Sequence, residues 1–169
     1  MDESLVMQLE SPCFVESKAL LIAGLRESYT AETRKDVVEQ WQRFGPLIGK
    51  VPGQVGRTAY GVWFNVLSNA ASFDCLTGVE VSDFSALPAE LSRVRIPAQT
   101  YATFRHREHV SKLWITMTAI GEWFPGSGYE IAHESSDAPD FFERYGEGFD
   151  PRTGIGDIEV WVPVKPLEG

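Results

Sequence analysis

The stretch TAYGVWFNV, residues 58–66, alternates between two kinds of side chain. Its even-numbered positions from Tyr60 onward are all aromatic or aliphatic, whereas its odd-numbered positions include Gly61, Trp63 and Asn65. Successive side chains of a β-strand point to opposite faces of a sheet, so this alternation predicts a strand with one core face. We expect the uniformly apolar face to be that core face.

The residues before this stretch predict a strand and then a helix. Residues 14–29 contain the apolar run ALLIA and are expected to form one strand. Thr30 is a suitable N-cap for the helix, Thr33 is an alternative cap, and Gly45-Pro46 ends it. The apolar side chains of the helix recur at helical spacing, at Val37, Val38, Trp41 and Phe44.

A further strand completes the first half of the chain, and the second half then repeats its order of elements. Residues 72–81 predict a further strand, joined to the alternating stretch by a polar turn at Ser68-Asn69, which completes the order strand, helix, strand, strand. The remaining sequence predicts one long strand, a helix, two short extended pieces and a closing strand, over residues 94–107, 109–124, 130–133, 141–145 and 157–164.

The two halves superimpose on one another with an offset of about 80 residues. WQRFGP at 41–46 falls on GEWFP at 121–125, and residues 60–65 fall on 140–145. This similarity predicts an internal duplication whose halves pack about a pseudo-twofold axis and leave a groove along it. The same offset places Trp63 opposite Glu143 across the groove.

The composition is that of one ordinary domain. The chain has 169 residues, of which 43% are hydrophobic and 23% charged, so we expect a single domain over residues 1–169 with a frayed segment at 1–12. The sequence contains neither a signal-peptide pattern nor an apolar run of bilayer length, and it predicts a cytoplasmic protein with no membrane contact. Cys13 and Cys75 need no special role there because thiols stay reduced in the cytoplasm.

The charge of the chain argues against direct contact with nucleic acid. The net charge is −9, from 24 acidic and 15 basic side chains, whereas a nucleic-acid surface needs clustered Lys and Arg. The aromatic content of 12%, with five tryptophans, is high for packing alone and favours an aromatic binding surface.

Three segments of the second half resemble a known family. WFPGSGY at 123–129, FERY at 142–145 and DIEVWVPV at 157–164 resemble the GyrI-like effector-binding domain of the SOUL/GyrI superfamily. That domain occurs behind the DNA-binding parts of AraC-type and MerR-type regulators and also alone, including on integron cassettes. The resemblance covers the chain from about Val15 to Val164.

The resemblance implies an α+β fold of duplicated βαββ units, with an antiparallel sheet, two main helices and a central ligand cleft. It also implies an aromatic cleft for organic ligands, often cationic, with an acidic residue at its centre, here Glu143. No helix-turn-helix is recognisable on either side, so we expect a stand-alone small-molecule binding protein. A role in transcription regulation would then need a partner protein, or the protein would sequester drugs.

The chemistry of Glu143 supports this expectation. Aromatic residues surround it in sequence, and Arg144 points to the opposite face of a strand, so a half-buried Glu143 carboxylate would lack an internal counterion. A bound organic cation would supply one, and Trp63, Tyr145 and Trp161 would add cation–π attraction. The alternative is a solvated Glu143 beside core aromatic residues.

The other aromatic candidates are assigned from strand parity. Trp63 and Trp161 lie on the more polar face of their strands and point into the groove or onto a helix, whereas Tyr60 lies on the apolar face and is more simply a core residue. Trp123 can cap the cleft. The predicted ligand-binding set is Glu143, Trp63, Tyr145, Trp161, Phe104, Tyr60 and Trp123.

Enzyme and metal motifs are weak. Gly126-Ser127-Gly128 lacks a full nucleophile elbow, and His106 and His109 lack a third metal ligand. Residues 146–157 lack the acidic spacing of a calcium loop, and no nucleotide-binding loop occurs. The sequence therefore predicts no catalytic residue, metal site or cofactor.

Two other function classes stay open. Some relatives hydrolyse cyclopropane-containing genotoxins, and Glu143 could act as a general base with Tyr145, Tyr101 or Tyr60 as proton donor. Relatives named for inhibiting gyrase suggest a protein-interaction function. The sequence leaves the oligomeric state and the natural ligand undetermined.

Overall fold

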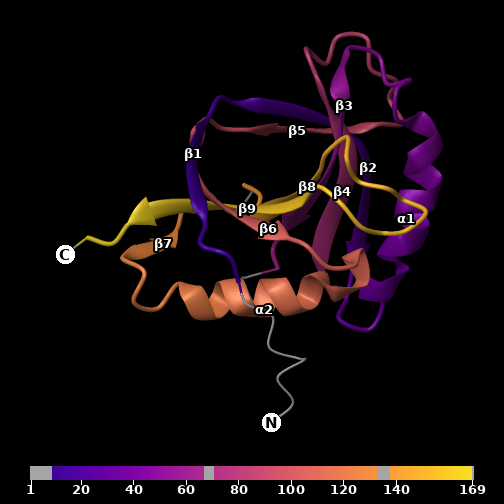
Figure 1. Ribbon diagram of the computed structural model, residues 1–169. Helices are drawn as coiled ribbons and strands as arrows, with labels where there is room; N and C mark the ends of the chain where they lie inside the picture. The colour runs from indigo at the N-terminus through magenta and orange to yellow at the C-terminus, as the bar shows by residue number, and fades with distance from the viewer. Residues whose placement is uncertain (1–8, 67–70, 133–137, 169) are drawn as a thin grey trace.

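The computed structural model describes residues 9–66, 71–132 and 138–168, which form a curled antiparallel sheet with two α-helices (Figure 1). The strands are β1 (Cys13–Ser17), β2 (Leu20–Tyr29), β3 (Gln54–Phe64), β4 (Phe73–Val81), β5 (Ser92–Ile96), β6 (Gln99–His106), β7 (Tyr129–Ile131), β8 (Phe141–Tyr145) and β9 (Ile158–Pro166). The helices are α1 (Val37–Phe44) and α2 (Leu113–Trp123), and 3-10 turns occupy Arg34–Asp36, Gly45–Leu47 and Val110–Lys112. The α+β class, the antiparallel sheet and the two helices are as predicted.

The strand order shows the duplication. The strands run β1-β6-β9-β8-β3-β4-β2-β5 across the sheet, and β7 pairs with β9. The centre of this order is the β8–β3 pair, with β9 and β6 on one side and β4 and β2 on the other. Each half therefore contributes three central strands and one helix, and the two halves meet where β8 lies beside β3.

The leading strand of each half crosses to the other half. β1 precedes β2 in the chain but pairs with β6, and β5 precedes β6 but pairs with β2. The predictions of single strands over 14–29 and 94–107 are therefore wrong, because the chain turns at Lys18-Ala19 and at Pro97-Ala98. Pro97 has no N–H to continue a strand ladder, which favours a break there. The predicted turn at Ser68-Asn69 lies outside the described residues.

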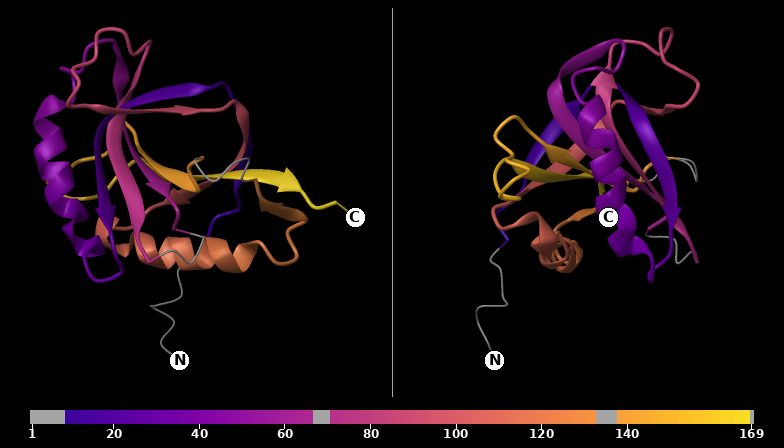
Figure 2. Two further views of the ribbon diagram at one scale, coloured as in Figure 1. Left: turned by 180° about the vertical axis from the view of Figure 1, so that it is seen from behind. Right: turned by 90° about the vertical axis from the view of Figure 1, so that its right-hand side faces the viewer.

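Both faces of the sheet are covered. One face packs against α1, which contacts β2 and β4, and α2, which contacts β6 (Figures 1 and 2). The other face lies inside the curl, where Tyr60, Val62 and Phe64 join a separate core cluster. The prediction of one core face on β3 is therefore incomplete, because side chains on both faces of this strand pack into a core. Within the described residues, no helix has the length and apolar character needed to cross a membrane.

A buried glutamine fixes α1 against the sheet. The Gln40 side chain is fully buried, accepts a hydrogen bond from the Tyr29 hydroxyl, and donates to the carbonyl oxygens of Leu25 and Cys75 at 2.8 and 3.0 Å. This anchoring sets the position of Trp41, the next residue, which packs against the same face of the sheet.

Candidate functional site

Glu143 lies at the join of the two halves. It is in β8, directly between Gly61 of β3 and Val160 of β9, and only 8% of it is exposed. The prediction that Trp63 lies opposite Glu143 is wrong, because Trp63 pairs with Phe141, two residue pairs further along the strands. The register is set by pairing across the whole sheet, and it brings a glycine to the position beside the carboxylate.

The absence of a side chain at Gly61 makes room for the Glu143 carboxylate. A Cβ atom at position 61 would lie 3.0 Å from Glu143 Oε1 and 3.4 Å from Cζ2 of Trp41. The carboxylate and the Trp41 indole therefore both lie against the backbone of Gly61. A glycine within a strand often marks such a close approach.

The carboxylate has polar neighbours but no cationic partner. The Tyr145 hydroxyl donates a hydrogen bond to Glu143 Oε1 at 2.9 Å. Among the described residues, no lysine or arginine forms an ion pair with Glu143. Burial raises the pKa of Glu143 to about 7, although the Tyr145 hydroxyl, the Trp63 N–H and the charge of Arg34 act in the opposite direction. At neutral pH the group is thus poised between its neutral and ionised forms.

The pKa of Tyr145 is also shifted. Burial, together with the neighbouring charge of Glu143, raises the pKa of the Tyr145 hydroxyl well above its ordinary value. The hydroxyl therefore keeps its proton and acts as the donor in the Tyr145–Glu143 hydrogen bond.

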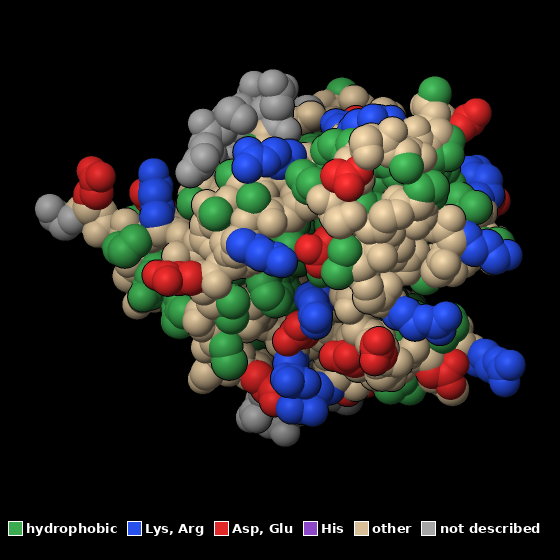
Figure 3. Space-filling view, turned by 90° about the horizontal axis from the view of Figure 1, so that it is seen from above, with side chains coloured by type: hydrophobic (Ala, Val, Ile, Leu, Met, Phe, Trp, Pro, Cys, Tyr) green, Lys and Arg blue, Asp and Glu red, His purple; other side chains and the backbone are tan. Residues whose placement is uncertain are grey.

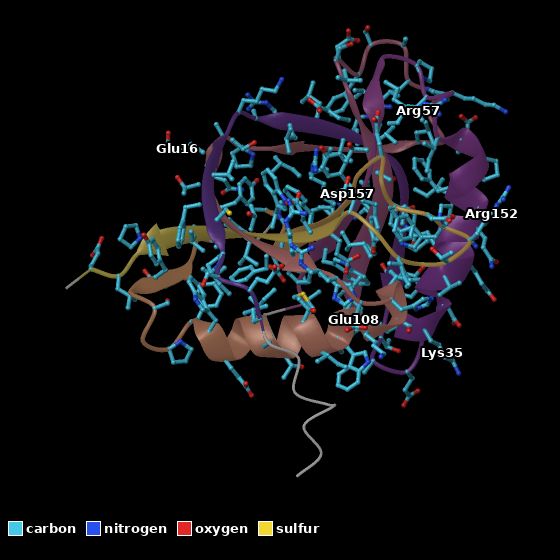
Figure 4. All side chains as sticks on the ribbon, viewed as in Figure 1. Glu16, Lys35, Arg57, Glu108, Arg152 and Asp157 are labelled. Atoms are coloured by element: carbon cyan, nitrogen blue, oxygen red, sulfur yellow. The ribbon has the colours of Figure 1, made fainter. Side chains whose placement is uncertain are left out.

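Aromatic rings surround this pair. Trp41 lies edge-on to Tyr145 with ring centroids 5.2 Å apart, and Phe149 contacts the same tyrosine at 5.0 Å. Phe149 belongs to the loop that follows β8, and Gly148 of that loop donates to Asp157 Oδ2 at 3.4 Å. Figure 4 shows Asp157 near the middle of the molecule, where the loop returns to β9. The loop and α1 therefore each contribute an aromatic ring that packs against Tyr145, the hydrogen-bond partner of Glu143.

The structure divides the predicted ligand-binding set between the two faces of the sheet. Glu143, Trp63 and Tyr145 lie together on the helix-covered face, and Phe104 packs in the same cluster, with Trp123 against it at 5.3 Å.

Tyr60 and Trp161 lie inside the curl instead, where both contact Phe142 at 5.5 and 5.4 Å. The indole N–H of Trp161 donates to Glu159, which also pairs with Arg144. These two aromatic residues are therefore separated from Glu143 by the sheet.

Three residues near the carboxylate did not follow from the sequence. Trp41 lies on the apolar stripe of a helix, and such a stripe predicts a core position without indicating what the helix covers. Phe149 lies in the segment 146–157, which is rich in glycine and aspartate and has neither strand nor helix periodicity. For Gly61 the sequence does contain a signal. A glycine between Tyr60 and Val62 in a predicted strand indicates that another group approaches the backbone closely there.

Other candidate sites are explained structurally. His106 is buried, and its ring nitrogens contact the Thr116 hydroxyl and the carbonyl oxygen of His109. The described residues contain no group of three or more His, Cys, Asp or Glu arranged to hold a metal ion. A cavity of about 240 Å³ lies away from Glu143, between the segments 47–52 and 88–91.

The surface charges are mixed. Seen from above, lysine and arginine side chains are interspersed with aspartate and glutamate (Figure 3). A nucleic-acid surface would require a continuous basic stripe, which this face does not present.

The described residues thus place a buried carboxylate and a tyrosine among aromatic rings where the two half-sheets meet. The sequence matches the family described as the GyrI-like small molecule binding domain over residues 11–165, and the chain belongs to this family. A comparison with curated protein sequences gives no match.

Solved structures share the fold. SAV2435 bound to tetraphenylphosphonium has a TM-score of 0.70 at 20% identity, covering 94% of each chain. The C-terminal domain of EcmrR has a TM-score of 0.66 at 14% identity, covering 95% of this chain and 100% of that one. The integron cassette protein VCH_CASS2, from the mobile metagenome of Vibrio cholerae, has a TM-score of 0.64 at 16% identity, covering 93% and 97%.

Proposed function

We propose that this protein binds hydrophobic organic cations, with the Glu143 carboxylate as the charge partner. The observation that carries the proposal is a buried carboxylate with one tyrosine hydrogen bond and no cationic partner among the described residues. The proposal places the protein in the cytoplasm as an effector-binding protein that acts in regulation through a partner or by sequestering multiple drugs.

The energetics favour a cation over other ligands. An unpaired ionised carboxylate in a protein interior costs several kcal/mol, and a bound cation recovers part of that cost. The rings of Trp41, Tyr145 and Trp63 offer cation–π attraction of about 0.5–2 kcal/mol each and cover the apolar part of the ligand. Because ring stacking tolerates many shapes, we expect broad specificity. The binding of tetraphenylphosphonium by SAV2435, which shares this fold, supports the same ligand class.

A pair of ions with the same shape and opposite charge tests the proposal. Tetraphenylphosphonium and tetraphenylborate are titrated into the wild-type protein, Glu143→Gln and Glu159→Gln. Glu159 is a matched control because it is a partly buried carboxylate on the opposite face, paired with Arg144. We expect the wild type to bind the cation and reject the anion. Glu143→Gln should lose at least tenfold in cation affinity, about 1.4 kcal/mol, whereas Glu159→Gln should not.

Equal affinity of the folded Glu143→Gln variant and the wild type for the cation would reject the role of Glu143. Tighter binding of tetraphenylborate than of tetraphenylphosphonium would reverse the charge preference. A loss confined to Glu159→Gln would move the ligand to the inside of the curl, beside Trp161.

Hydrolysis at the same site is a second candidate function. The Tyr145–Glu143 hydrogen bond and a Glu143 pKa of about 7 suit a general base that works near neutral pH. An electrophilic cyclopropane-containing compound incubated with the protein would gain the mass of one water molecule, as measured by mass spectrometry. Recovery of the unchanged compound would leave binding as the function.

A further inference from the structure

The indole N–H of Trp63 is a buried donor with no hydrogen-bond partner in the described part of the chain. Trp63 is only 7% exposed, and its Nε1 atom makes no hydrogen bond among the described residues. Buried polar side-chain atoms in folded proteins nearly always have a partner, so an unpaired one calls for an explanation.

The position of Trp63 connects this donor with the carboxylate. Trp63 follows Gly61 by two residues in β3, and Gly61 pairs with Glu143, so Trp63 and Glu143 share one face of the sheet. The indole N–H acts on the Glu143 carboxylate as a nearby hydrogen-bond donor does and lowers its pKa. The contact still falls short of hydrogen-bond geometry, so the N–H has no full partner.

The described residues that pair or stack with the Trp63 side chain are apolar or weak acceptors. Its cross-strand partners are Phe141 and Cys75, and its ring lies 5.8 Å from that of Phe73. The Tyr145 hydroxyl already donates to Glu143 Oε1. The polar part of the site therefore combines one carboxylate that attracts a cation with one free N–H that suits an oxygen atom.

Building on the proposed function, we propose that the Trp63 N–H donates a hydrogen bond to an oxygen atom of the ligand. The preferred ligands are amphipathic cations that carry a carbonyl or another oxygen acceptor a few bonds from the charged centre. A cation without such an oxygen binds through Glu143 and the aromatic rings alone and leaves the indole donor unpaired. Trp63 thus determines specificity within the ligand class that Glu143 selects.

Two cations that differ by one carbonyl group test this inference. Trimethyl(4-phenylbutyl)ammonium and trimethyl(4-oxo-4-phenylbutyl)ammonium are titrated calorimetrically into the wild type, Trp63→Phe and Trp41→Phe. We expect the wild type to bind the ketone about fivefold more tightly, which is the size of one neutral hydrogen bond. Trp63→Phe should bind both cations equally, because phenylalanine retains a ring but has no N–H. Trp41→Phe, which alters another indole beside Glu143, should weaken both cations alike and keep the fivefold ratio.

The outcomes separate this inference from the proposed function. If neither cation binds the wild type, the proposed function itself fails. If the alkyl cation binds in a Glu143-dependent way but the ketone has no advantage, or if Trp63→Phe keeps the advantage, the role of Trp63 is overturned and the cation site remains.

Should Trp63→Phe not fold, the indole protons of the ¹⁵N-tryptophan-labelled wild type provide the measurement. A downfield shift of the Trp63 indole proton with the ketone alone supports donation to the ligand. The same shift with both cations indicates donation to the ionised Glu143 carboxylate and overturns the inference.

Discussion

Glu143→Gln should stabilise the protein at pH 8 far more than at pH 5. The pKa of Glu143 is about 7 in the folded protein, against 4.5 for an ordinary glutamate, because burial disfavours the charged form. A raised pKa in the folded state means that the folded protein binds the proton more tightly than the unfolded chain does. The stability contributed by this group is thus complete below about pH 4.5 and is lost as the pH rises through about 7.

The size of the effect follows from the same two values. Between pH 5 and pH 8 the wild type should lose about 2–3 kcal/mol of unfolding free energy through Glu143. Glutamine has a similar shape and does not titrate, so the variant lacks this loss. The difference in unfolding free energy between Glu143→Gln and the wild type should therefore grow by that amount over the same pH range.

Urea unfolding at pH 5, 6, 7 and 8 measures the difference. Glu16→Gln is the control for the loss of one negative charge, because Glu16 is exposed on β1 and points outward (Figure 4). Parallel pH profiles for Glu143→Gln and the wild type would refute the reasoning, since they would mean that the carboxylate is not desolvated. Saturating tetraphenylphosphonium should flatten the wild-type profile, because a bound cation favours the ionised carboxylate.

Three further predictions concern the residues around the site. Gly61→Ala should destabilise the protein by about 1–3 kcal/mol and weaken cation binding, because the new Cβ lies 3.0 Å from Glu143 Oε1. The control is Gly121→Ala in α2, where the new Cβ would meet no atom within 4 Å. Urea unfolding measures the change in stability, and calorimetry measures the change in cation affinity. Gln40→Leu should lower the free energy of unfolding, measured in urea, by about 3 kcal/mol, because it removes the hydrogen-bond partner of the Tyr29 hydroxyl and of the Leu25 and Cys75 carbonyls. An unchanged unfolding free energy would contradict the anchoring role of Gln40. Burial lowers the pKa of His106, so the stability that its neutral ring contributes is complete above about pH 6.5 and is lost as the pH falls below that value. In thermal unfolding at pH 7.5, 6 and 5, His106→Gln should therefore lose less stability towards acid pH than the wild type.

The local sequence determined the kinds of element and their order. The alternation around Tyr60 and the helical spacing that ends at Phe44 predict a strand and a helix without reference to the rest of the chain, and both are present as β3 and α1. The repeat of this order predicted the two halves. Such patterns are readable because the periods of a strand and of a helix are local properties of the backbone. Strand alternation in the FERY segment also puts Glu143 and Tyr145 on one face, as β8 has them.

Only the tertiary structure decided what lies beside Glu143. Alternation shows which residues share a face, but when both faces are covered it cannot say which face meets which partner, and this is why Tyr60 and Trp161 were grouped with Trp63. The register that brings Gly61 to Glu143 depends on pairing between strands about eighty residues apart in the chain. The placement of Trp41 beside Gly61 and Tyr145 depends on the docking of α1, which the buried Gln40 side chain fixes. Both are long-range arrangements, and they form only when the two halves pack together.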